Sequence, residues 1–246
     1  GALLLKEITG ITRICMTVPE DSDLADQFEN FQILKTSRTY PATIPSMIMK
    51  DHLNMSPVPG RTPEDQGVCF IRPEALVSLS RVYAEKEQVF EKIITVIDKA
   101  GARNRVKAVI GTPLSKILGK LGIHVNEMDR IVIGGPLKGF ATFSHHHPVV
   151  EDMNMVIIQD RDIIPELSDY PCVNCGKCIR ICPANVPVNL LVRYLEADQY
   201  EEAADKFDLE SCIECGLCAY VCTARIPLYQ YIRLGKHELT TLRAES

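Results

Sequence analysis

The 246-residue sequence contains no apolar run that approaches the roughly 18 to 20 residues of a membrane-spanning helix, so we expect no transmembrane segment. Basic residues are not in excess either, because 27 Lys and Arg stand against 32 Asp and Glu and the net charge is −5. A nucleic-acid-binding protein normally shows a basic stripe, so we expect no nucleic-acid partner. Low-complexity tracts are also absent. The length suits two or three modest globular domains.

Cysteine is the residue that stands out, and eight of the ten cysteines form two runs with the same spacing. Each run leaves two, two and three residues between successive cysteines, and Pro183 follows the first run. In this pattern three thiolates bind one 4Fe-4S cluster while the fourth ligates the other cluster. We therefore expect two 4Fe-4S clusters with crossed ligation, one on Cys172, Cys175, Cys178 and Cys222 and the other on Cys212, Cys215, Cys218 and Cys182.

Two other uses of cysteine are weaker alternatives. Zinc also binds Cys-x2-Cys pairs, but eight cysteines in two identical runs without a histidine are typical of clusters. A disulfide framework is less expected still, because the eight cysteines share one segment of a long chain. Thiolate clusters favour a reducing compartment, which predicts a cytoplasmic location. The other two thiols, Cys15 and Cys69, lie in apolar stretches and are expected in the core.

The charges inside the two runs differ. Lys177 and Arg180 lie within the first run, whereas Glu214 lies within the second. A 4Fe-4S centre gains negative charge on reduction, so nearby cations favour the reduced state and nearby carboxylates oppose it. We therefore predict that the first-run cluster is the easier one to reduce.

Ahead of the cysteine runs, the sequence predicts strands and helices in two groups. Residues 1–88 form a partial α/β domain, and residues 89–160 follow the strand–strand–helix–strand order of a β-grasp domain. A polar linker with Pro165 spans Asp160 to Asp169, and residues 161–246 form an all-helical ferredoxin domain with two clusters. The predicted class is α+β and multidomain. Its predicted strands are 11–19, 31–36, 67–72, 93–97, 106–110, 130–133 and 149–159, and its predicted helices lie near 44–53, 75–83, 114–121, 190–195 and 201–204.

The order of these parts resembles a known family. The most specific motifs are Ile133-Gly-Gly-Pro-Leu-Lys-Gly-Phe140, Cys212-Ile-Glu-Cys-Gly216 and Ile226-Pro-Leu228. Through them the chain resembles the C-terminal two-thirds of the C subunit of the Rnf ion-translocating oxidoreductase complex, as a short form lacking the N-terminal flavin-loop region. The resemblance implies a partial Rossmann-like first domain and an SLBB-like β-grasp domain. It also implies a peripheral position on the inner face of the cell membrane, other complex subunits as partners, and a ferredoxin or flavoprotein as electron donor or acceptor.

Flavin is the one cofactor of this family that we expect the chain not to bind. The family is thought to take electrons from NADH through FMN, whose phosphate needs backbone N–H groups from a glycine-rich turn. That turn would lie before Gly1. Two further flavin-side motifs are altered, because Ala42 replaces a flexible glycine and Pro73 lacks an N–H donor. A truncated sequence, or a subunit split between two chains, are alternative explanations.

Three other features have structural interpretations. His145 to His147 are expected in a solvated turn, Gly134-Gly135 in a tight turn, and Glu201 to Lys206 on a solvated helix face. The sequence therefore predicts no catalytic residue. We expect an electron-carrying subunit of a translocating oxidoreductase rather than a complete enzyme. The alternatives are a flavin-dependent NADH dehydrogenase subunit whose FMN loop is missing from this chain, and a non-redox scaffold that the clusters hold together.

Overall fold

The computed structural model describes residues 1–24, 28, 31–168 and 170–245. The chain divides into two compact units, Gly1–Val89 with Glu210–Ile213, and Phe90–Leu209 with Glu214–Ser246. Helices occur together with parallel and antiparallel strand pairs, so the predicted α+β class is confirmed. Among the described residues, no helix is both long and apolar enough to cross a membrane.

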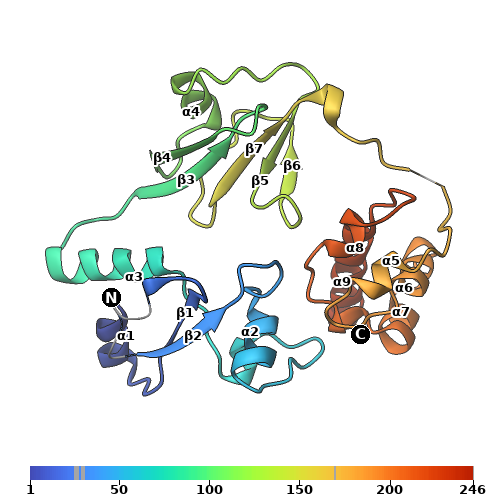
Figure 1. Ribbon diagram of the computed structural model, residues 1–246, viewed down its shortest axis with the longest axis horizontal. Helices are drawn as coiled ribbons and strands as arrows, with labels where there is room; N and C mark the ends of the chain where they lie inside the picture. The colour runs from blue at the N-terminus through green and yellow to red at the C-terminus, as the bar shows by residue number, and fades with distance from the viewer. Residues whose placement is uncertain (25–27, 29–30, 169, 246) are drawn as a thin grey trace. The chain divides into compact units, whose positions relative to one another are not determined.

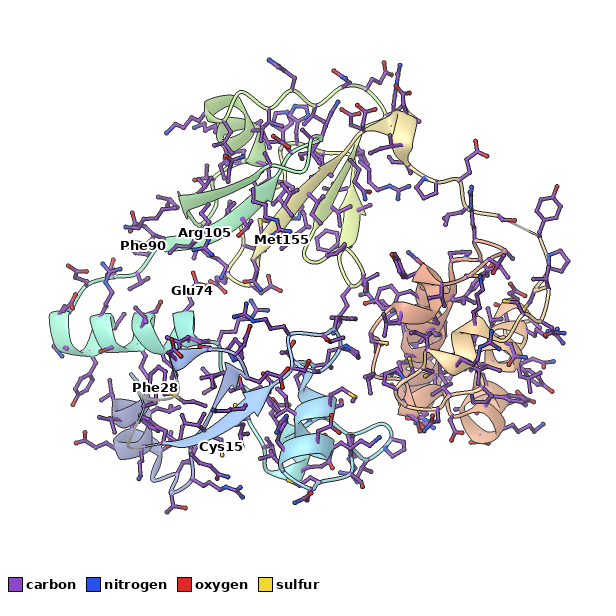
Figure 2. All side chains as sticks on the ribbon, in the orientation of Figure 1. Cys15, Phe28, Glu74, Phe90, Arg105 and Met155 are labelled. Atoms are coloured by element: carbon purple, nitrogen blue, oxygen red, sulfur yellow. The ribbon has the colours of Figure 1, made fainter. Side chains whose placement is uncertain are left out.

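The first unit contains a two-stranded parallel sheet flanked by short helices. Strands β1 and β2 pair in register from Cys15 opposite Gln32 to Pro19 opposite Thr36. Cys15 opens β1 (Figure 2) and is partly buried. Pro45 and Pro73 open helices α2 and α3, where a missing N–H costs nothing. The elements are α1 (Ala2–Thr9), β1 (Cys15–Pro19), β2 (Gln32–Thr36), α2 (Pro45–His52), η2 (Glu64–Gln66), α3 (Pro73–Ser80) and η3 (Arg81–Glu85).

Two expectations for the first unit are wrong. The predicted strand at 67–72 does not form, because Gly67 takes a left-handed conformation after η2 and Pro73 already opens α3. The few residues between these two helical elements pair with neither β1 nor β2. Cys69 lies in this segment and is exposed, so its predicted place in the core is also wrong. Helix α1, in contrast, was not predicted.

The second unit begins with a five-stranded mixed sheet in the order β4-β3-β7-β5-β6 (Figure 1). Strand β3 pairs antiparallel with β4 and parallel with β7, and β5 pairs antiparallel with both β7 and β6. Helix α4 buries Leu114, Ile117 and Leu118 in the same core as the inward residues of the strands. The elements are β3 (Glu91–Ile97), β4 (Arg103–Val109), α4 (Leu114–Lys120), β5 (Arg130–Ile133), β6 (Phe140–Thr142) and β7 (Met155–Gln159).

The predicted strand at 149–159 is too long. Glu151 and Asp152 form a turn, so β7 begins only at Met155. The buried Val149 instead bonds through its backbone to the segment that precedes α4: its N–H donates to Thr112 O at 2.9 Å. Strand β6 was not predicted, because its three residues are too short to show a pattern.

The remainder of the second unit is helical. No strand occurs among residues 161–168 and 170–245, and the last residue of the predicted linker, Asp169, lies outside the described residues. The buried faces of α6, α7 and α9 meet around Leu191, Ala203 and Ile232. The elements after β7 are η4 (Arg161–Ile163), α5 (Lys177–Arg180), α6 (Val188–Glu196), α7 (Tyr200–Phe207), η5 (Leu209–Ser211), α8 (Leu217–Tyr220) and α9 (Leu228–Glu245). The last two residues of η5 group with the first unit.

Candidate iron–sulfur site

The two cysteine runs adopt the same backbone conformation twice. In each run a glycine in the left-handed region, Gly176 with φ of 71° and Gly216 with φ of 78°, precedes a single-turn helix, α5 or α8. The fourth cysteine follows that helix, and its N–H donates to a carbonyl three residues earlier. An apolar residue and a proline then lead into a longer helix, α6 or α9. The repeat in the sequence is therefore also a repeat in the structure.

A pocket in the second unit collects four thiols from both runs. Cys172, Cys175, Cys178 and Cys222 all line it, and these are the four residues expected to bind one cluster. Its other side chains are mainly apolar, including Val192, Ile226 and Leu228. Thiolates lined by apolar groups are a donor set that fits a 4Fe-4S cluster. The ligand assignment itself stays a prediction.

Three cysteines of the second predicted ligand set lie in the second unit, and the fourth, Cys212, does not. Cys215 and Cys218 are buried, and Cys182 of the first run lies close enough to Cys215 to affect its ionisation. Cys212 falls in the short segment that groups with the first unit. The proximity of Cys182 to Cys215 is what crossed ligation requires.

The pKa values of the cysteine thiols shift in different directions, according to their burial and hydrogen bonds. The backbone N–H of Lys177 and the Thr223 hydroxyl hold the pKa of the Cys175 thiol below its ordinary value. Burial raises the pKa of Cys178 and of Cys215. A cysteine must be deprotonated to bind a cluster, so cluster binding at the buried thiols releases protons. The free energy of binding the iron must therefore offset the cost of ionising thiols with a raised pKa.

Among the described residues, no three His, Cys, Asp or Glu side chains are arranged to hold a single metal ion. The same holds for His145 to His147, of which His145 and His146 lie in an exposed turn, as predicted. A cubane places each cysteine on a different iron, so its four thiolates need not converge on one point. The observed arrangement is therefore consistent with a cluster.

The second run is more deeply covered than the first. Cys175 is exposed, whereas its counterpart Cys215 is only 7% exposed. Part of the cover is the loop after β5: a Cβ added at Gly216 would lie 2.3 Å from the carbonyl oxygen of Leu137. The hydroxyl of Tyr229 donates to the carbonyl of Lys138 in the same loop at 3.4 Å. The glycine at 216 is thus required by close approach as well as by its φ.

This difference in exposure predicts the order in which the clusters are lost. When the protein with both clusters is treated with an iron chelator, we expect the first-run cluster to be lost several-fold faster, because its Cys175 edge is open to solvent. EPR of the reduced protein at successive times measures the order. The signal that disappears first should be the one missing from a Cys175→Ser variant. Earlier loss of the second-run signal would contradict the prediction.

The structure also refines the charge argument. The carboxylate of Glu214 pairs with Lys236 on α9 at 3.0 Å, so its negative charge is partly offset. The guanidinium of Arg180 donates to the carbonyl of Cys175 at 3.1 Å, which places a cation beside the first run. Solvent exposure at Cys175 also favours the more negative reduced state. The prediction that the first-run cluster is easier to reduce therefore rests more on Arg180 and exposure than on Glu214.

Sequence reasoning missed one polar residue of the pocket, Asn189. The internal repeat could have pointed only to its position, because Asn189 and Tyr229 occupy the second position of α6 and α9. Each position lies at the start of the helix that follows a cysteine run, but the two side chains differ in chemistry.

Comparison with known proteins first identifies the family of the domain that contains the cysteine runs. The 4Fe-4S dicluster domain family matches residues 171–226, a range that contains both cysteine runs. Residues 171–226 therefore belong to a family of iron–sulfur domains. The number of clusters that they hold stays a prediction.

The same comparison gives the relatives, which are C subunits of ion-translocating oxidoreductase complexes. The chain is 32% identical over 222 residues to the one from Edwardsiella ictaluri, a match that covers 89% of this chain and 28% of that protein. It is 33% identical over 171 residues to the one from Serratia proteamaculans, covering 69% and 24%. The Rhodobacter capsulatus protein is 35% identical over 99 residues, covering 40% and 19%. The chain is thus a relative of these proteins, as its motifs predicted, and spans about a quarter of their length.

Proposed function

We propose that this chain is the iron–sulfur relay of an Rnf-type membrane oxidoreductase complex and passes single electrons through two 4Fe-4S clusters. The observation that carries the proposal is the pocket that brings Cys222 of the second run together with Cys172, Cys175 and Cys178 of the first. When bound, each cluster supplies reversible one-electron chemistry. The chain's own residues supply thiolate ligands, and apolar side chains such as Val192 and Leu228 keep water from the site.

The other parts of the chain are proposed to act as docking elements. The five-stranded sheet with α4 supports an SLBB-like β-grasp domain over residues 89–160, and the parallel β1–β2 pair with its helices supports a partial Rossmann-like domain over residues 1–88. Residues 161–246 would form the ferredoxin domain. Other subunits of the complex are the proposed partners, with a ferredoxin or flavoprotein as donor or acceptor. The proposed location is the inner face of the cell membrane.

We propose that residues 1–88 bind no FMN. The support lies in Ala42, which restricts a turn where glycine would be flexible, and in Pro73, which opens α3 without an N–H donor. Stoichiometric FMN released on denaturing the protein as the cell makes it would instead favour the flavin-dependent alternative.

An EPR-monitored redox titration tests the relay. We expect two reversible one-electron midpoints, because a relay must accept and release electrons without losing its clusters. The first-run cluster should have the higher midpoint potential. Clusters that stay loaded but cannot be reduced reversibly would favour the structural-scaffold alternative.

A further inference from the structure

Asn189 is the polar side chain among the otherwise apolar and thiol groups of the first cluster pocket. It lies on the first turn of α6. Its Oδ1 is buried and, among the described residues, accepts no hydrogen bond. Its Nδ2 donates to Oδ1 of Asn174 at 3.5 Å, the outer limit of a hydrogen bond. A buried oxygen atom without a donor is unusual, because buried polar groups are normally satisfied.

A cluster in the pocket would favour contact with the N–H side of this amide over contact with its oxygen. A 4Fe-4S cluster with four thiolates is an anion whose sulfur atoms accept hydrogen bonds. A carbonyl oxygen without a donor gains nothing beside such an anion, whereas an amide N–H can bind it. Rotation of the amide by half a turn would exchange the two groups.

The surroundings permit this rotation. Oδ1 of Asn174 already accepts from Nη2 of Arg193 at 2.8 Å, so it keeps a strong donor when Asn189 turns away. After rotation, Oδ1 of Asn189 would face Oδ1 of Asn174, and both oxygens would need a donor. The Arg193 guanidinium already donates to Oδ1 of Asn174, lies one turn further along α6 than Asn189, and has further N–H groups for this purpose. A second N–H of Arg193 would then satisfy the oxygen of Asn189 that now accepts no hydrogen bond.

On the basis of the proposed relay function, we propose that Asn189 donates an N–H···S hydrogen bond to the first-run cluster and raises its reduction potential. Hydrogen bonds to the sulfurs stabilise the more negative, reduced state. The device is specific to one cluster. At the equivalent position of α9 stands Tyr229, whose hydroxyl is directed to the carbonyl of Lys138. Asn189 is thus a tuning residue and would not be a ligand.

The variant Asn189→Leu tests the proposal, because leucine keeps a similar volume and removes the donor. At the wild-type midpoint of the first-run cluster, the ratio of reduced to oxidised cluster should fall about tenfold, a shift of about 59 mV for one electron. The midpoint of the second-run cluster should not move. The control is Gln199→Met, which makes the same amide-to-apolar change on an exposed residue. Full loading with both midpoints unchanged in Asn189→Leu would overturn the proposal.

A second measurement covers a leucine variant that fails to load. Asn189→Ser keeps a hydroxyl donor and should retain both clusters. In pulsed EPR, protein labelled with ¹⁵N-asparagine should show a nitrogen coupling to the reduced first-run cluster that is missing from Asn189→Ser. The same coupling in both proteins, or in neither, would overturn the role of Asn189. Failure of the wild-type protein to form reducible clusters would instead overturn the proposed function.

Discussion

Replacing Cys222 with serine is expected to damage the cluster held by the first cysteine run, although Cys222 belongs to the second. The reason is the pocket that Cys222 shares with Cys172, Cys175 and Cys178. A hydroxyl is a much weaker ligand for iron than a thiolate, because soft sulfur ligands suit these clusters. We expect the variant to lose most of the first-run signal, about half of the total cluster content, and to keep the second-run signal.

Two reference variants identify which EPR signal belongs to which cluster. Cys175→Ser removes a ligand of the first run, and Cys215→Ser removes one of the second. Under crossed ligation the EPR spectrum and iron content of Cys222→Ser resemble those of Cys175→Ser, and Cys182→Ser resembles Cys215→Ser. Cys69→Ser, an exposed thiol outside both runs, is the control and should match the wild type. The opposite pairing of spectra would show that each run binds its own cluster.

The second large effect is expected at Asp129, which anchors the five-stranded sheet. Its side chain is fully buried and pairs with Lys99 at 2.5 Å. It also accepts the N–H groups of Asn126 at 2.5 Å and Arg161 at 3.2 Å. Asp160 lies 3.5 Å from the same lysine. The carboxylate thus joins β5 to the segments that follow β3 and β7.

Asp129→Asn should lower the free energy of opening this sheet by about 2–3 kcal/mol. The variant removes a partly buried ion pair and leaves backbone N–H groups with a weaker acceptor. Hydrogen exchange of the amides of Val96 and Val156, which are fully buried strand residues, measures the opening in the protein with its clusters. Asp162→Asn is the control, because the Asp162 carboxylate is 81% exposed and its pair with Arg161 should contribute little. Equal effects of the two variants would contradict this account.

The contribution of Asp129 should also depend on pH. Burial alone would raise the pKa of Asp129, but the hydrogen bonds from Lys99 and from the backbone N–H groups of Asn126 and Arg161 outweigh it and hold the pKa below its ordinary value of 3.8. A carboxyl with a lowered folded-state pKa stabilises the fold above its unfolded-state pKa. The stability is lost as the pH falls through the folded-state pKa. Wild type and Asp129→Asn should therefore converge in stability in acid, and a constant difference down to low pH would contradict the sign.

The cysteine runs were readable from the sequence because their information is local. The spacing of Cys172, Cys175 and Cys178 fixes a loop and one helical turn, and the second run repeats it. The same is true of short apolar strands such as β5, whose predicted bounds match the structure. In these segments, local pattern and tertiary packing favour the same structure.

The wrong strand predictions concern apolar stretches in which some or all residues pair with no neighbouring strand. Residues 67–72 have the composition of a strand, but Gly67 and Pro73 place helical elements on both sides and no neighbouring strand pairs with them. Cys69 became exposed for the same reason. In 149–159, the Glu151-Asp152 turn outweighed the apolar pattern.

The details of the site that the sequence did not show depend on contacts between distant residues. Glu214 was treated as a free charge, but α9 places Lys236 against it. Asn189 carries no motif, and its role follows only from the unpaired oxygen in the pocket. Such pairings require the folded arrangement of α6 and α9, which spacing along the chain does not specify.

Mössbauer spectroscopy of the protein assembled with ⁵⁷Fe tests the central claim most directly, because it reports the type and redox state of all the bound iron. The account predicts that the oxidised sample shows only the spectrum of 4Fe-4S clusters, with iron sufficient for two per chain. On reduction, this spectrum should convert to that of the reduced clusters and return on reoxidation. Iron bound as single ions, iron sufficient for only one cluster, or clusters that reduction leaves unchanged would contradict a two-cluster electron relay.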